Sequence, residues 1–237
     1  MAAFRVVRSA ARLAAAGVGL ASAAYAGLVA SAWCRYGTQA PPRLHGRDEL
    51  LDRFMPVYDV VERHRIFVAA PAATVLAAAK EQDLMQSPLA RVIFRARELA
   101  LGATSDDQAR PHGLLAFTQS LGWGVLAEEP DREVVVGAVT RPWEANVVFR
   151  SVAPDRFVAY NDPGNVKIVW TLRARPVGDN ATIFLTETRA VATDPAARRK
   201  FRSYWAFASP GIAAIRWLSL LPLRKDAERR ARALQAA

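Results

Sequence analysis

Hydrophobic and polar residues alternate along several short runs in the second half of the chain. The clearest run lies within residues 165–175, where the apolar face carries Val166, Ile168, Trp170 and Leu172. A period of two is typical of a strand with one buried face and one solvated face. Residues 58–68 show the same period, with Val60, Glu62, His64, Ile66 and Val68 on one face. The folded domain is therefore expected to begin at about residue 58.

Turn residues divide the remainder of this region into further strand-like runs. The pattern predicts seven strands in all, the other five being 114–126, 133–140, 145–151, 156–161 and 181–193. Gly122-Trp123-Gly124 indicates a bend or bulge inside the first of these five. Two short helices are expected between the first and second strands, one from Pro71 to about Gln82 and one from Ser87 to Leu101.

The last strand leads into the longest helical pattern of the chain. Asp194 can accept hydrogen bonds from the first free N–H groups of this helix, and Pro195 suits its first position. Ser209-Pro210-Gly211 is expected to kink or end the helix. The apolar stretch 212–223 that follows is expected either to pack on the sheet or to dip into a membrane interface, with its arginines on head groups.

The order of one strand, two helices, six strands and one long helix predicts an α+β fold. Its economical packing is an antiparallel sheet curled around the last helix. The end of the last strand and the start of the helix carry a motif: Thr186-Glu187-Thr188-Arg189, Asp194-Pro195, Arg198, Phe201 and Tyr204-Trp205. On this motif, residues 58–232 resemble the START-like superfamily, also called SRPBCC or helix-grip proteins, and its bacterial members in particular.

The resemblance implies a cavity between the sheet and the closing helix. Such a cavity would bind a hydrophobic small molecule, a lipid or a polyketide-like compound. The superfamily shares a cavity and not a reaction, so the resemblance implies no particular chemistry. No cofactor is expected.

The N-terminal pattern differs from the rest of the chain. Arg5, Arg8 and Arg12 precede 22 uncharged residues, Leu13 to Cys34, which are enough to cross a bilayer as a helix. We therefore expect a membrane-anchoring helix within residues 1–36, a linker over 37–57 and a short tail over 233–237. A cleaved signal peptide that leads to export, an organellar transit peptide and a segment buried in the protein are the alternatives.

The net charge of +10 is concentrated outside the predicted sheet: residues 1–55 carry +4, residues 56–193 carry −1 and residues 194–237 carry +7. Basic residues beside apolar stretches suit an anionic membrane surface, whereas a nucleic-acid module usually carries its positive charge on the folded domain. A membrane is therefore the expected partner, and nucleic acid is not. The single cysteine, Cys34, excludes an internal disulfide and a thiolate zinc cluster, and no metal site is expected.

Nine residues are the candidates for contact with a ligand in the predicted cavity. They are His64, Trp143, Ile168, Trp170, Leu172, Glu187, Arg189, Phe201 and Trp205. The tryptophans have simple core packing as an alternative. Which face of the last strand points inward is open, and Glu187 with Arg189 can equally form a structural ion pair.

A rival prediction is an enzyme of the cyclase or dehydratase kind, with His64 or Glu187 transferring a proton. A histidine on an apolar strand face is also compatible with a satisfied core residue. A third possibility is a structural or partner-binding protein whose cavity is filled by its own side chains. The ligand and the oligomeric state are left open.

Overall fold

The computed structural model describes residues 2–38, 48–83, 91–93, 95, 102 and 111–236, without the side chains of residues 2–15 and 18. In chain order its elements are α1 (Ala2–Arg35), α2 (Glu49–Asp52), β1 (Val60–Val68), α3 (Ala72–Glu81), α5 (Leu114–Ser120), β2 (Gly124–Glu129), β3 (Glu133–Thr140), β4 (Phe149–Arg150), α6 (Pro154–Phe157), β5 (Val166–Gly178), β6 (Ala181–Ala192) and α7 (Pro195–Gln235). The helix expected over 87–101 lies mostly outside the described residues.

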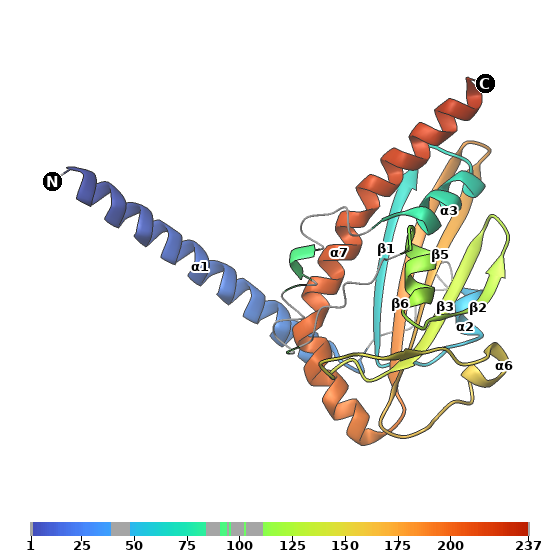
Figure 1. The fold of residues 1–237 in the computed structure, drawn as a ribbon, viewed down its shortest axis with the longest axis horizontal. Coiled ribbons are helices and arrows are strands. Elements are labelled where there is room, and N and C mark those ends of the chain that lie inside the picture. Colours follow the sequence, from blue (N-terminus) through green and yellow to red (C-terminus); the bar gives the residue numbers. More distant parts are fainter. Residues whose placement is uncertain are drawn as a thin grey trace.

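All strand pairs are antiparallel, and the strands follow the order β1-β6-β5-β3-β2, with β4 paired to the end of β3. The long helix α7 lies along one face of this sheet (Figure 1). The expected α+β class, the antiparallel sheet and the closing C-terminal helix are confirmed. This arrangement agrees with a helix-grip fold.

Over the described residues the sheet has six strands, so the prediction of seven was wrong. Residues 156–161 form no strand, because Pro154–Phe157 makes a helical turn that buries the ring of Phe157 completely. The run 114–126 is divided between α5 and β2. Gly122 makes this division possible, since its φ of +99° and its approach to the backbone of Phe149 both exclude a side chain.

The two faces of the sheet are covered by different elements. On the inner face, α3 and α7 bury a core that includes Val134, Val136, Trp170, Leu172, Phe184, Leu220 and Leu223. On the outer face, α2 and α6 bury Leu50, Leu51, Met55, Leu126, Val135, Phe157 and Val169. Residues 48–57 were expected to be a polar linker. They instead form a strap over the outer face, because Leu50, Leu51 and Met55 insert into it.

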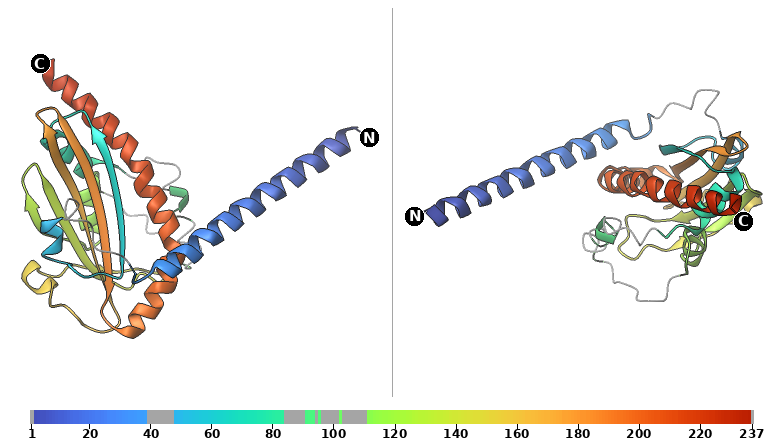
Figure 2. Two further views of the ribbon diagram at one scale, coloured as in Figure 1. Left: turned by 180° about the vertical axis from the view of Figure 1, so that it is seen from behind. Right: turned by 90° about the horizontal axis from the view of Figure 1, so that it is seen from above.

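Helix α7 continues through Pro210 and Pro222 without ending. It bends where it passes α1 (Figure 2), in keeping with the loss of a backbone hydrogen bond at an internal proline. One side of its C-terminal half is held to the inner face of the sheet by Leu220, Leu223, Ala227 and Ala231. The expected kink is therefore accommodated within one helix.

The end of α1 packs against α7, and the remainder of α1 projects away from the sheet (Figures 1 and 2). The Tyr25 hydroxyl donates to the carbonyl of Phe207 at 2.5 Å, and the Arg202 guanidinium donates to the carbonyl of Trp33 at 3.0 Å. Beyond the helix end, Tyr36 is buried against Phe201. The core thus extends to residue 36, earlier than the boundary at 58 expected from the sequence.

Among the described residues, α7 is the helix that is long and apolar enough to cross a membrane. In its most apolar 18-residue stretch, 22% of the residues are buried. The expected placement of a spanning helix at the N-terminus has no support from this criterion. In α1 the described side chains are nonetheless largely exposed, with Leu20 at 74% and Leu28 at 53%. Two apolar helix surfaces therefore face outward from the domain.

We expect Gly122→Ala to destabilise the protein by more than about 1 kcal/mol, since alanine at a positive φ is strained. A Cβ at this position would also lie 2.3 Å from the carbonyl oxygen of Phe149. The urea midpoint of the full-length protein in detergent measures the effect. Gly178→Ala is the matched control, because its nearest contact is an ordinary 3.9 Å. Equal midpoints for the two variants would contradict this account of the α5–β2 turn.

Candidate ligand-binding site

Polar side chains meet on the inner face of the sheet where β1, the edge strand, pairs with β6. Cross-strand partners are Glu62 with Thr188 and His64 with Thr186. Residues two apart on a strand share a face, so all four side chains point toward α7. Together with Arg216 of α7 they form the inner polar cluster. It lies next to Trp170 and Leu172, which pair with Thr188 and Thr186 from β5.

Arg216 joins this cluster from the opposite side. Its Nη1 donates to the Thr186 hydroxyl at 2.9 Å. It forms no direct ion pair with Glu62 within 4.0 Å among the described contacts, although the two charges attract each other. The guanidinium has five N–H donors. Most of its capacity to bind an oxygen-bearing group is therefore unused by the described residues.

Within the described part of the chain, three buried side-chain atoms have no hydrogen-bond partner. Two of them belong to this cluster, Nε2 of His64 and Oγ1 of Thr188, and the third is Nη2 of Arg189 on the outer face. The nearest carboxylate oxygen to Nε2 is that of Glu62, at 3.8 Å, which is too long for a hydrogen bond. Burying a polar atom without a partner costs free energy, and such atoms are uncommon in folded proteins. Two of them on the same face of the paired strands β1 and β6, flanking the Thr186 that Arg216 contacts, indicate a place where a bound molecule would supply the missing partners.

Burial determines the charge state of the cluster. Burial lowers the pKa of His64, and the positive charge of Arg216 lowers it further, so the imidazole is neutral near pH 7. Burial raises the pKa of Glu62, against the opposing effect of Arg216. Burial also lowers the pKa of Arg216 to about 10, which leaves it charged. The cluster thus offers a cationic donor, a hydroxyl and a neutral imidazole that can accept a proton.

The predicted cavity residues divide between two places on the inner face. His64, Trp170 and Leu172 lie in or beside the inner polar cluster. Phe201 and Trp205 pack with Ile168 and Trp143 in a separate cluster near the start of α7. Trp205 and Arg216 are eleven residues apart, or about 16 Å along the helix. The space next to Phe201 is thus occupied by the protein's own aromatic rings.

Glu187 and Arg189 lie on the outer face, away from α7. The Arg189 side chain is fully buried, and it donates to Glu187 at 2.7 Å, to Asp52 at 2.5 Å and to the carbonyl of Met55 at 2.7 Å. Arg63 donates to the same Glu187 carboxylate at 2.8 Å. This network fastens the strap to the sheet. Neither residue is therefore placed to orient a ligand beneath α7.

A second buried carboxylate, Glu133, also lies on the outer face. It accepts a hydrogen bond from the Thr171 hydroxyl at 2.7 Å and has Arg173 at 3.4 Å. Burial raises the pKa of Glu133 to about 8, and a hydrogen bond with the neighbouring carboxyl of Asp48 adds to this effect. Asp48 itself caps α2 by accepting from the N–H of Leu51. At neutral pH the two carboxyl groups thus share a proton beneath the strap.

The sequence pointed to His64 but not to the residues that surround it. Glu62 and Arg216 had detectable signals: Glu62 shares the strand face of His64, and Arg216 is the sole charge in the apolar stretch 212–223. Thr186 and Thr188 belong to the motif at the end of the last strand, but the sequence left open whether they or Glu187 and Arg189 point inward. Of the residues that the structure describes, no three acidic, histidine or cysteine side chains are grouped so as to hold a metal ion.

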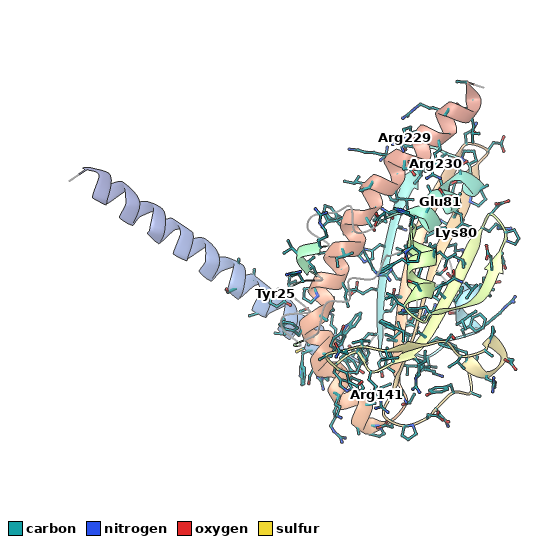
Figure 3. All side chains as sticks on the ribbon, viewed as in Figure 1. Tyr25, Lys80, Glu81, Arg141, Arg229 and Arg230 are labelled. Carbon is teal, nitrogen blue, oxygen red and sulfur yellow. The ribbon has the colours of Figure 1, made fainter. Side chains whose placement is uncertain are left out.

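Ion pairs near both ends of α7 fix this helix over the inner face of the sheet. Near its start, Arg198 pairs with Asp59 at 2.8 Å. Near its end, Arg230 donates to Glu81 of α3 at 2.6 Å, and the two side chains lie close together at the far end of the sheet (Figure 3). Arg216 therefore approaches the sheet from a helix that is fixed on both sides.

Comparison with known proteins identifies no family. No family model matches the chain, and no curated protein matches it. Among solved structures, norcoclaurine synthase from Thalictrum flavum in complex with dopamine and hydroxybenzaldehyde aligns with 78% of this chain and 97% of its own, at 14% identity and a TM-score of 0.31. The Zhui aromatase/cyclase from Streptomyces aligns with 74% and 97%, at 16% identity and a TM-score of 0.24. These values are too low to carry an argument, so the fold rests on the topology and the site on its contacts.

We expect Glu133 to contribute a loss of stability as the pH rises from about 4.5 to about 8. The ordinary pKa of a glutamate is 4.5, and in the folded state that of Glu133 is about 8. The folded state therefore binds more protons than the unfolded state in this window, with a slope of up to about 1.4 kcal/mol per pH unit. Urea midpoints at pH 5 and pH 8 measure it.

Glu133→Gln should flatten this dependence, because glutamine mimics the protonated carboxyl. Glu129→Gln, at an exposed position on the neighbouring strand, is the control and should leave the dependence unchanged. A pH dependence that persists in Glu133→Gln would place its origin elsewhere.

Proposed function

We propose that this protein binds a hydrophobic small molecule beneath α7, with an oxygen-bearing polar group of that molecule at the inner polar cluster. The observation that carries the proposal is the pair of unpartnered buried atoms, His64 Nε2 and Thr188 Oγ1, beside the underused guanidinium of Arg216. A carbonyl, phenolate or carboxylate oxygen could accept from Arg216 and Thr188 together. The resemblance to START-like proteins points in the same direction.

The surroundings of the cluster favour a ligand that is otherwise apolar. Trp170, Leu172 and Phe184 line the adjacent inner face, and Ile66 is only partly buried there. The Glu62 side chain is 28% exposed, so the cluster is reached from solvent along the β1 edge. A few polar groups on an apolar wall are typical of small-molecule sites. Lipids and polyketide-like compounds combine these properties.

Arg216→Met should abolish retention of such a ligand while preserving the fold. Methionine keeps much of the apolar volume of the arginine stem and removes every donor. Native mass spectrometry of the full-length protein, extracted gently in detergent, should show an added mass in the wild type that the variant lacks. The matched control is Arg229→Gln, which removes an exposed charge from the same helix.

Equal added mass in Arg216→Met and in the wild type would contradict the site. A wild type without any added mass, and without binding of apolar carboxylates or phenols, would leave the third possibility, a domain filled by its own side chains. Circular dichroism of each variant separates loss of binding from loss of fold.

An enzyme that uses the same site is the second candidate, and the free Nε2 of His64 favours it. A neutral imidazole with a vacant nitrogen can accept a proton from a bound molecule. Glu187 cannot assist, because it lies on the outer face. In this case an incubated ligand should return with a changed mass or structure, and His64→Gln should stop the change while the ligand still binds.

We further propose that α1 anchors the domain in a membrane. The uncharged segment Leu13–Cys34, the exposure of Leu20 and Leu28, and the projection of α1 away from the sheet support this location. A helix satisfies its own backbone hydrogen bonds and can therefore cross a bilayer. Helix α7 is less suited, since insertion would strip Leu220 and Leu223 from the core.

Full-length protein should accordingly remain in the membrane fraction after a carbonate wash. Ala24→Asp places a charge near the middle of the uncharged segment, where it opposes insertion by about 3 kcal/mol. This variant should shift to the soluble fraction, whereas Ala236→Asp, at the exposed end of α7, should not. If both variants stay in the membrane, α1 is not the anchor and α7 becomes the candidate.

A further inference from the structure

An open pocket of about 320 Å³ lies where the end of α1 meets the beginning of α7. Its lining residues are Tyr36, Pro195, Arg198, Arg199 and Arg202. It is remote from the inner polar cluster, since Arg202 and Arg216 are fourteen residues apart, or about 21 Å along the helix. Three arginines around one hollow make it a distinct candidate for an anion.

The three arginines differ in how far their hydrogen-bonding capacity is used. Arg198 pairs with Asp59. Arg202 donates from Nε and Nη2 to the carbonyl of Trp33 and stacks over the Trp33 ring at 4.4 Å. Arg199 is exposed, and its guanidinium has no ion pair among the described contacts. The Arg199 guanidinium and Nη1 of Arg202 have no hydrogen-bond partner among the described residues and are therefore available to a ligand.

The two nearby carboxylates are already engaged with other groups. Asp59 accepts from Arg198, from the Tyr36 hydroxyl and from the N–H of Ala192. Asp194 accepts from the first N–H groups of α7, so the helix terminus itself is not open to an anion. The charges of Arg199 and Arg202 consequently remain uncompensated at the pocket.

The position of the pocket indicates where its anion comes from. Trp33 lies at the end of the uncharged segment of α1, and Arg35 and Tyr36 follow that segment. Aromatic and basic residues of this kind concentrate at the level of lipid head groups. Guanidinium groups bind phosphate oxygens in a bidentate manner. A phosphate held on a lipid would therefore meet Arg199 and Arg202 at the right depth.

We propose that this pocket binds the phosphate of an anionic phospholipid head group. The lipid acyl chains would run beside the exposed faces of α1, and the phosphate would lie between the guanidinium groups of Arg199 and Arg202. The choice of a lipid rather than free phosphate rests on the proposed anchoring by α1. The ability of the pocket to bind an anion does not depend on that anchoring.

The test uses full-length protein in detergent micelles and two short-chain probes, dihexanoyl phosphatidylglycerol and dihexanoyl phosphatidylcholine. Titration by native mass spectrometry should show tighter binding of the anionic lipid. Arg199→Gln should weaken that binding by about three- to tenfold, because one charge-assisted contact is lost at an exposed site. Arg199→Lys should retain part of it, and Arg229→Gln, which removes a distant charge from α7, should leave it unchanged.

Equal affinity for the two lipids, or no effect of Arg199→Gln, would contradict the proposal that this pocket binds an anion. Displacement of the lipid by an equal concentration of inorganic phosphate would assign the pocket to free phosphate and contradict the proposal that its ligand is a lipid. The carbonate wash, applied to the same variants, reports on the anchor separately. Arg199-dependent lipid binding by a protein that carbonate releases would uphold the pocket and reject the anchoring by α1.

Discussion

The alternation of side chains along β6 divides the polar groups of this protein between two environments. Thr186 and Thr188 point inward beneath α7, whereas Glu187 and Arg189 point outward beneath the strap of residues 48–57. A strand must send successive side chains to opposite faces, so these roles cannot be exchanged without shifting the whole register. The alternation of side chains along β6 therefore places the charges that fasten the strap on one face and the hydroxyl groups of the inner polar cluster on the other.

The outer network shows why a buried ion pair is compatible with a structural role. Arg189 is completely buried, and a guanidinium in that position is costly unless its charge is paired. Two carboxylates and a backbone carbonyl accept from its Nε and Nη1, and Nη2 has no partner among the described residues. The inner polar cluster is less fully paired, since Arg216 has one described hydrogen bond and two polar atoms near it have none. The inner face also has partial access to solvent at Glu62, which is the reason to place a ligand there.

Helix α7 serves several surfaces at once. Its first turns form the pocket with α1, its middle carries Arg216 over the β1 edge, and its last turns pack on α3 and the inner face. Because Tyr36 directly follows α1 and packs in the core next to Phe201, the orientation of α1 is coupled to the start of α7. A membrane anchor in α1 would hold the arginine pocket close to the bilayer surface.

The local pattern of hydrophobic and polar residues was sufficient to predict the broad architecture. The period of two in β1 and β5, the capping residue Asp194 and the long final helix follow from neighbours in the chain, and each was predictable from the sequence. Errors arose where a short run had no distinguishing period, as in residues 156–161. They also arose where a segment with a polar sequence contained residues that are buried in the fold, as at Leu50, Leu51 and Met55.

The candidate site was only partly accessible from the sequence. His64 and the inward face of β5 could be inferred from alternation within a strand. The grouping of Glu62, Thr188 and Arg216 could not, because Glu62 lies more than a hundred positions from the other two and the three meet only when β1 pairs with β6 and α7 closes over them. The sequence by itself determined the elements and their faces, whereas only the tertiary structure decided which face is the interior, since that depends on which segments cover it.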